Sequence, residues 1–155
     1  MKFVADSSLL VRLYIRDNKT DIIERFIAED GKILSISELA RVEVLNVLVR
    51  YDEAATRFLA NLEEGTRFRL ELLDWHAIFQ QADSLARRFS RTLKPGGHDI
   101  VLVAAAVVSG ANWFLSFDSN SCQRPLAACA GLRVWPPLER EEKGLVRHAT
   151  RQAAG

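Results

Sequence analysis

The chain has few of the features that mark secreted, membrane-spanning or zinc-binding proteins. Its two cysteines, Cys122 and Cys129, lie late in the 155 residues, and their spacing fits no metal-ligand or redox motif. No apolar run approaches the roughly 20 residues that cross a bilayer. The first residues lack the basic segment and long apolar segment of a signal peptide. We therefore expect a reduced, cytoplasmic protein that does not enter a membrane.

An excess of either charge is also missing. Lys and Arg number 21 and Asp and Glu number 20, so the overall charge neither favours nor excludes a nucleic-acid partner. Such a partner would have to bind a local basic patch. Hydrophobic residues make up 48% of the chain, which fits one globular domain with a core of its own.

Short apolar runs alternate with longer segments of helical periodicity over residues 1–136. The expected strands are 2–5, 31–37, 67–74, 112–118 and 132–136. The expected helices are 7–16, 19–29, 75–93, 98–110 and 121–131, with two helices or one broken helix over 37–65. This alternation predicts an α/β fold, a single domain with a central parallel β-sheet flanked by helices on both faces. Residues 137–155 form a charged C-terminal tail, for which we expect a frayed end, a loose helix or a partner-binding extension.

Four carboxylates are expected at one edge of this sheet, because ligands of open parallel sheets bind outside the carboxyl ends of the strands. Asp6 and Asp118 end two strands, Glu43 lies on the helix after the second strand, and Asp99 opens the helix over 98–110. Singly, each has an ordinary role: a helix cap, a turn or a solvated side chain. Together they would repel one another unless a cation neutralised them. Glu38 fits better as a residue that the helix dipole favours.

Oxygen ligands without a nearby set of Cys or His favour Mg²⁺ or Mn²⁺ over Zn²⁺. Two other magnesium-dependent classes fit less well. A response-regulator receiver needs a second acid next to the first, and a phosphatase of the haloacid dehalogenase type needs one two residues later. Ser7 and Ser8 occupy those positions.

Four segments resemble, in the right order, the signature segments of PIN-domain ribonucleases, and in particular the VapC-type toxins of toxin–antitoxin pairs. They are "FVADSSLLVRLY", "SISELARVEVLNVL", "HDIVLVAAA" and "FLSFD". The resemblance runs from Lys2 to about Val134 and implies a PIN-like nuclease domain over residues 1–136. It further implies Mg²⁺-dependent cleavage of single-stranded RNA by metal-activated water. The implied protein partners are a cognate antitoxin and a second copy of the chain, forming a homodimer.

The same resemblance assigns roles to individual residues. Catalysis and metal binding fall to Asp6, Glu43, Asp99 and Asp118, and supporting roles to Ser7 and Ser116. The third segment departs from the family pattern, because Leu102 stands where a His is usual. The loop after Asp118 is also roughly two residues longer than usual. These departures keep open the alternative of a catalytically weak PIN-like RNA-binding or regulatory module.

Basic residues near these acids are candidates for contact with RNA phosphates. They are Arg12, Arg16, Arg87, Arg88, Arg91 and Lys94. The alternative for each is a solvated helix face. We expect His98, beside Asp99, to be a loop residue rather than a ligand.

Overall fold

Five short strands form one sheet in the order β3-β2-β1-β4-β5. The strands are β1 (Phe3–Ala5), β2 (Leu34–Ser37), β3 (Phe68–Glu71), β4 (Trp113–Leu115) and β5 (Arg133–Trp135). The computed structural model describes residues 1–155. Each neighbouring pair of strands is parallel, as the sequence predicts.

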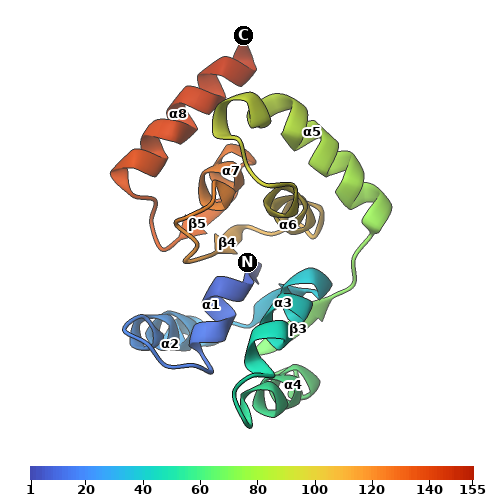
Figure 1. Cartoon of the computed structure of the whole chain (residues 1–155), viewed down its shortest axis with the longest axis vertical. Helices are drawn as coiled ribbons and strands as arrows, with labels where there is room; N and C mark the ends of the chain where they lie inside the picture. Colours follow the sequence, from blue (N-terminus) through green and yellow to red (C-terminus); the bar gives the residue numbers. More distant parts are fainter.

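Helices cover both faces of the sheet (Figure 1). One face carries α1 (Ser7–Arg12), α2 (Thr20–Ala28), η1 (Glu29–Gly31), α3 (Glu38–Leu48) and α4 (Ala54–Glu64). The other carries α5 (Trp75–Leu93), α6 (Gly97–Val108), α7 (Gln123–Cys129) and α8 (Arg140–Ala154). The α/β class is therefore confirmed. None of these helices combines the length and the apolar character that a bilayer crossing requires.

Two apolar layers hold the sheet between the helices. Phe3 and Ala5 face the first layer, which includes the fully buried Phe58 of α4. Val4 faces the second layer, which includes Phe89 of α5. This alternation follows from the two-residue period of a strand. Since both faces are covered, polar side chains that act on a ligand are left to the edges of the sheet.

The order of the strands places a topological switch point between β1 and β4. The chain runs from β1 outward to β2 and β3, and then returns to the other side of β1 to form β4 and β5. The backbone N–H of Asp6 donates to the carbonyl of Leu115 at 3.0 Å, so the ends of the two central strands lie side by side. Ligands of open α/β sheets bind at such a point.

The charged C-terminal segment is a packed helix rather than a frayed tail. Helix α8 lies against α5 and α7, and its Ala149 is fully buried. Small apolar residues provide this contact, which explains why the sequence shows no dense apolar face there. The stretch 37–65 consists of two helices, α3 and α4.

Candidate metal and active site

Asp6 follows β1 directly and is the N-cap of α1. Its side chain is buried, with the residue 3% exposed, and it accepts hydrogen bonds only from neutral groups. Ser8 Oγ donates to Oδ1 at 2.6 Å, the backbone N–H of Leu9 donates to Oδ1 at 3.3 Å, and Ser116 Oγ donates to Oδ2 at 2.7 Å. The capping role is thus real, yet the carboxylate has no cationic partner. A buried charge without one is costly.

The protonation of Asp6 reflects this burial. Removal from water raises the pKa of Asp6 to about 6, although the hydrogen bonds from Ser8, Ser116 and Leu9 act in the opposite direction. The nearby charge of Asp118 raises this pKa further. Above pH 6 the switch point therefore holds a desolvated negative charge that a bound cation would stabilise.

Hydroxyl groups from two elements orient the Asp6 carboxylate. Ser8, rather than the Ser7 singled out in the sequence, makes this contact, and it also accepts from the backbone N–H of Phe117 at 2.9 Å. Ser116, a residue that the sequence did single out, accepts from the backbone N–H of Asp118 at 3.1 Å. The side chain of Gln123 lies 3.0 Å from Ser116 Oγ. The ends of β1 and β4 are thereby joined through side chains.

Replacing Ser8 by Ala is expected to lower the free energy of unfolding by about 1 kcal/mol, since two hydrogen bonds to buried groups are lost. Affinity for Mn²⁺ should fall roughly 10-fold or more, because the Asp6 carboxylate loses a group that orients it. Ser7→Ala is the matched control and should change stability by less than about 0.5 kcal/mol. Urea unfolding and titration with Mn²⁺ measure the two quantities. Equal effects of the two substitutions would contradict the assignment to Ser8.

Asp118 lies in the loop after β4. Its Oδ1 accepts from the backbone N–H of Asn120 at 3.0 Å, and its Oδ2 accepts from Ser121 Oγ at 2.9 Å. Asp118 therefore stabilises a turn, which is one of the ordinary roles that the sequence analysis gave for the candidate acids. It is also close enough to Asp6 for its charge to act on the Asp6 carboxyl group.

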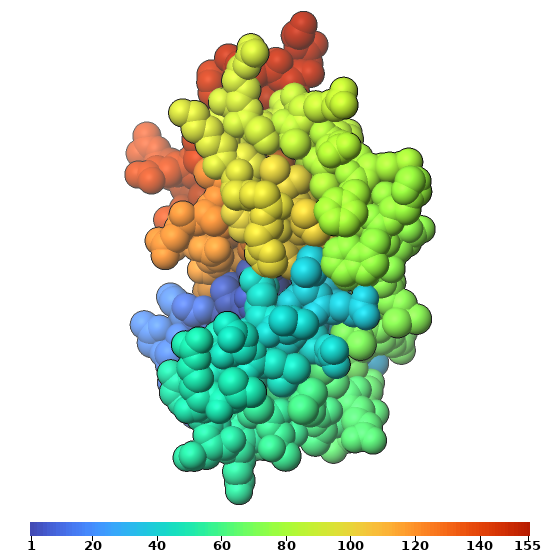
Figure 2. All heavy atoms as spheres, turned by 45° about the vertical axis from the view of Figure 1, so that its right-hand side comes forward, coloured from blue at the N-terminus to red at the C-terminus, as the bar shows by residue number.

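Glu43 and Asp99 form a second part of the site, where α3 meets the start of α6 (Figure 2). Glu43 Oε1 lies 2.7 Å from Nε2 of His98, while its Oε2 is buried and has no hydrogen-bond donor. Asp99 Oδ2 accepts from the backbone N–H of Gly96 at 3.1 Å and so caps α6. Burial raises the pKa of the Cys122 thiol, and the nearby negative charge of Asp99 raises it further. His98 belongs to the first turn of α6, so the expectation of a loop residue is wrong, and its ring contacts Glu43.

Two observations indicate that the oxygen atoms of these acids fit a cation with oxygen ligands. Asp6 is a buried carboxylate without a cation, and Glu43 Oε2 is a buried carboxylate oxygen without a donor. Both are hard oxygen ligands of the kind that Mg²⁺ or Mn²⁺ prefers. However, no three acidic, histidine or cysteine side chains are close enough together to hold one ion in this conformation. Glu43, Asp99 and Asp118 are each engaged with protein groups, so ligation by them requires an exchange of these contacts.

The basic candidates fall into two groups. Arg12 is packed on Phe117, 5.4 Å from the ring centroid, and pairs with Asp17 at 2.9 Å. Arg16 pairs with Asp21 at 2.6 Å. The candidates on α5 and at its C-cap are exposed and form no ion pair: Arg87, Arg88, Arg91 and Lys94. The second group is therefore the one that is free to contact phosphates.

Sequence reasoning missed the role of Arg124. Its side chain is 6% exposed and pairs with Glu142 of α8 at 2.8 Å, and it also donates to the carbonyl of Ser116 at 2.6 Å. It donates further to the carbonyls of Pro136 and Pro137. No local pattern around Arg124 announces this, because its partners are 8 to 18 residues away. Ser8 carried a weak signal, since it is a hydroxyl in the first turn after an N-cap carboxylate.

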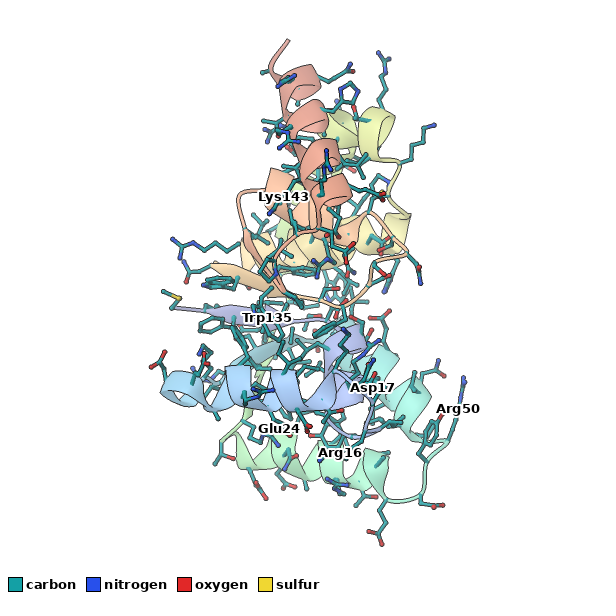
Figure 3. The ribbon with its side chains drawn as sticks, turned by 90° about the vertical axis from the view of Figure 1, so that its left-hand side faces the viewer. Arg16, Asp17, Glu24, Arg50, Trp135 and Lys143 are labelled. Carbon is teal, nitrogen blue, oxygen red and sulfur yellow. The ribbon has the colours of Figure 1, made fainter.

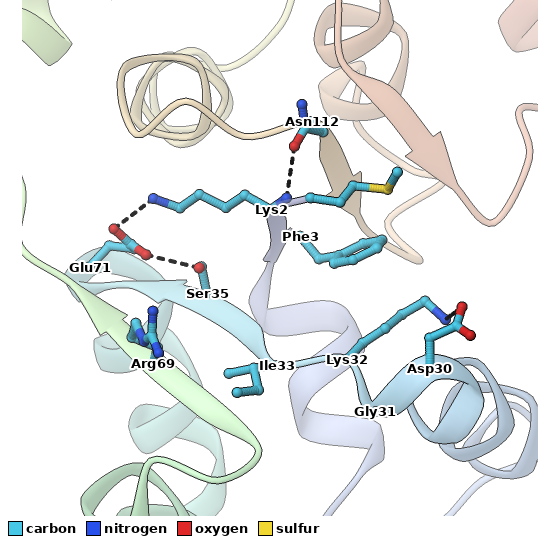
Figure 4. A pocket seen from close by; sticks show the side chains of 11 residues that line it. Lys2, Phe3, Asp30, Gly31, Lys32, Ile33, Ser35, Arg69, Glu71 and Asn112 are labelled. Atoms are coloured by element: carbon cyan, nitrogen blue, oxygen red, sulfur yellow. Dashed lines mark hydrogen bonds and ion pairs between the residues drawn. The ribbon is translucent and has the colours of Figure 1, made fainter.

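A cavity of about 680 Å³ lies elsewhere, at the amino ends of the strands (Figure 4). Lys2, Ser35, Arg69 and Glu71 are among its lining residues. Glu71 accepts from Ser35 at 2.8 Å and pairs with Lys2 at 2.8 Å, so both of these charges already have partners within the protein. None of the four candidate acids lines this cavity.

Two solved structures resemble this fold. The VapC20 toxin of Mycobacterium tuberculosis, described as cleaving the sarcin-ricin loop, superposes with a TM-score of 0.62 at 20% identity. That match covers 85% of this chain and 99% of VapC20. FitAcB from Neisseria gonorrhoeae gives a TM-score of 0.58 at 14% identity, covering 87% of this chain and 97% of that chain. A search of curated proteins gave no match.

A family model settles the relationship that the four segments and the strand order indicate. The model of the PIN domain matches residues 3–125, which contain the whole of the site from Asp6 to Gln123. Strands β1 to β4, the switch point and the four candidate acids lie inside this range, and only β5 follows it, within ten residues of its end. The chain therefore belongs to the PIN domain family.

Proposed function

We propose that this protein is a Mg²⁺-dependent endoribonuclease, the VapC-type toxin of a toxin–antitoxin pair. The observation that carries the proposal is Asp6, a buried carboxylate at the switch point with two orienting hydroxyls and no cationic partner. Membership of the PIN domain family and the fold shared with VapC20, a toxin described as cleaving the sarcin-ricin loop, support the same function.

Four residues would hold the metal: Asp6, Glu43, Asp99 and Asp118. A bound Mg²⁺ supplies an activated water and offsets the charge that develops on the phosphate. Ser8 and Ser116 keep the Asp6 carboxylate in a fixed orientation by donating to its two oxygens. Burial of Asp6 between β1 and β4 keeps bulk water away from one side of the site. Cleavage by water is expected to leave 5′-phosphate and 3′-hydroxyl ends.

The proposal extends to partners and location. A cognate antitoxin protein and a second copy of the chain are the expected protein partners, in the cytoplasm. The catalytic unit would span residues 1–136, with α8 as an addition to it. Size measurement of the purified chain, alone and co-expressed with the product of a neighbouring antitoxin reading frame, tests both associations.

The decisive experiment is cleavage of structured RNA by the purified chain in Mg²⁺ or Mn²⁺, beside EDTA. Transfer, ribosomal and messenger RNA are tested separately. Asp99→Asn should abolish cleavage, because it removes a carboxylate charge from the site. The matched control is Asp83→Asn, since Asp83 is exposed on α5 and takes part in no ion pair.

The outcomes separate the two functions considered. Cleavage that requires the metal and Asp99 and leaves 5′-phosphate ends supports the ribonuclease. Cleavage that survives EDTA or Asp99→Asn contradicts it. Metal binding by a folded protein that cuts none of the RNAs favours the catalytically weak RNA-binding or regulatory module.

A further inference from the structure

Helix α8 carries four basic residues on one face. Arg140, Lys143, Arg147 and Arg151 are all exposed. Their spacing of three, four and four residues puts them on one side of the helix. The buried Ala149 is two residues from Arg147 and from Arg151, and therefore lies on the opposite side. We call these four residues the α8 basic stripe.

The α8 basic stripe has no partner within the chain. None of its four side chains forms an ion pair or a hydrogen bond. Three arginines of residues 1–83, Arg12, Arg16 and Arg67, do pair with an acid, whereas the exposed Arg25, Arg50 and Arg57 do not. Residues 84–155 contain ten Lys and Arg against five Asp and Glu, whereas residues 1–83 contain eleven against fifteen. The net charge is therefore positive in residues 84–155, which include α8, and negative in residues 1–83.

A direct connection links α8 to the candidate active site. The buried Arg124 donates to the carbonyl of Ser116 and to both carboxylate oxygens of Glu142, in the first turn of α8. Ser116 in turn donates to Asp6. The helix therefore begins beside the end of β4, and the α8 basic stripe extends from there for about 16 Å at the rise of an α-helix. Figure 3 shows Lys143 in the upper half of the molecule and Arg50 in the lower half.

We propose that the α8 basic stripe binds the phosphate backbone of RNA beyond the cleavage site, without regard to base sequence. The inference rests on the proposed ribonuclease function. Unpaired cations on a rigid helix complement a regularly charged strand. Helix α8 contains no Phe, Tyr or Trp on which bases would stack. Contacts of this kind position a nucleic acid but do not read it, so the choice of target lies with other residues.

An acidic protein surface is the competing occupant, and RNA is favoured by the connection to the site. A substrate held at Asp6 has to continue past the cleaved bond, and Arg124 anchors the start of α8 next to that point. The family model ends at residue 125, so α8 lies outside the part of the chain that it describes.

The test replaces all four residues of the stripe by Gln in the full chain. The matched control replaces four exposed cations of the other half: Lys19, Arg25, Arg50 and Arg57. Binding of two unrelated fluorescein-labelled 20-nucleotide RNAs is measured in EDTA across a range of salt concentrations, so that cleavage plays no part. Far-UV circular dichroism and thermal unfolding check that both variants fold.

Loss of four phosphate contacts should raise Kd at least tenfold and lower the slope of log K against log salt by about 3 for single-stranded RNA. The loss should be equal for the two sequences and absent from the control variant. Unchanged Kd and slope in the stripe variant would overturn the inference, and loss of binding to a polyglutamate peptide instead would assign the stripe to an acidic protein. A sequence-dependent loss would also overturn it. If RNA binding depends on the stripe but the metal-loaded chain cuts no RNA, the ribonuclease proposal fails and the phosphate-binding surface stands.

Discussion

Replacing Asp6 by Asn is expected to abolish RNA cleavage and, at the same time, to stabilise the metal-free protein at pH 7. Cleavage should fall by a factor of roughly 10³, because the central carboxylate of the site loses its charge. The metal-free protein should gain up to about 3 kcal/mol in free energy of unfolding, since the cost of burying an unpaired charge disappears. Urea unfolding in EDTA and single-turnover cleavage in Mg²⁺ measure the two effects.

The gain in stability depends on pH with a definite sign. The pKa of Asp6 is raised by burial from 3.8 to about 6, so the folded state binds more protons than the unfolded state between these values. The contribution of Asp6 to stability is complete below pH 4 and is lost as the pH rises through 6. Wild type and Asp6→Asn should therefore be about equally stable at pH 4 and should differ increasingly up to pH 7.

The Asn side chain fits the same hydrogen bonds. Ser116 Oγ lies within 3.0 Å of the Gln123 side chain, so it can donate there and accept from the new amide nitrogen. The control is Asp83→Asn, an exposed change that should leave both stability and cleavage unaltered. A destabilised Asn variant at pH 7, or a difference that does not change with pH, would contradict the view of Asp6 as a buried and unpaired charge.

The fold could be predicted from the sequence because its signals are local. Each strand is a short apolar or alternating run between helical segments, and parallel pairing follows from that order of strands and helices. The packing of helix α8 was harder to predict from the sequence, because its contact with the core depends on the small residues Ala149 and Ala153. Side chains of this size give a weak hydrophobic pattern even where they are buried.

The candidate site was predictable in part for the same reason. Asp6 could be placed because it directly follows a strand of the sheet, whereas Ser116 was assigned by the resemblance to PIN-domain ribonucleases. The contact between Glu43 and His98 joins residues 55 positions apart, and no local pattern encodes it. Which serine faces Asp6 depends on the geometry of the first turn of α1, and the sequence offers two adjacent candidates, Ser7 and Ser8.

Arg124→Met is expected to be the most destabilising single substitution outside the apolar core, with a loss of about 3 kcal/mol or more. The buried guanidinium donates hydrogen bonds to the Glu142 carboxylate and to the carbonyls of Ser116, Pro136 and Pro137. Without it, Glu142 remains as a charge that is only 15% exposed, has no cationic partner and keeps only the backbone N–H of Glu139 as a donor. Urea unfolding at pH 7 measures the loss, with the exposed Arg133→Met as the control.

A double-variant cycle with Glu142 separates the ion pair from the contacts to the carbonyls. If the unpaired Glu142 charge causes most of the loss, Arg124→Met combined with Glu142→Met should recover a large part of it, because apolar side chains often replace a buried ion pair without net cost. Cleavage should not recover with stability, since the carbonyl of Ser116 still lacks its donor and Ser116 orients Asp6. Recovery of both would mean that Arg124 acts only through α8, and a single-variant loss below about 1 kcal/mol would mean that the network contributes little to the fold.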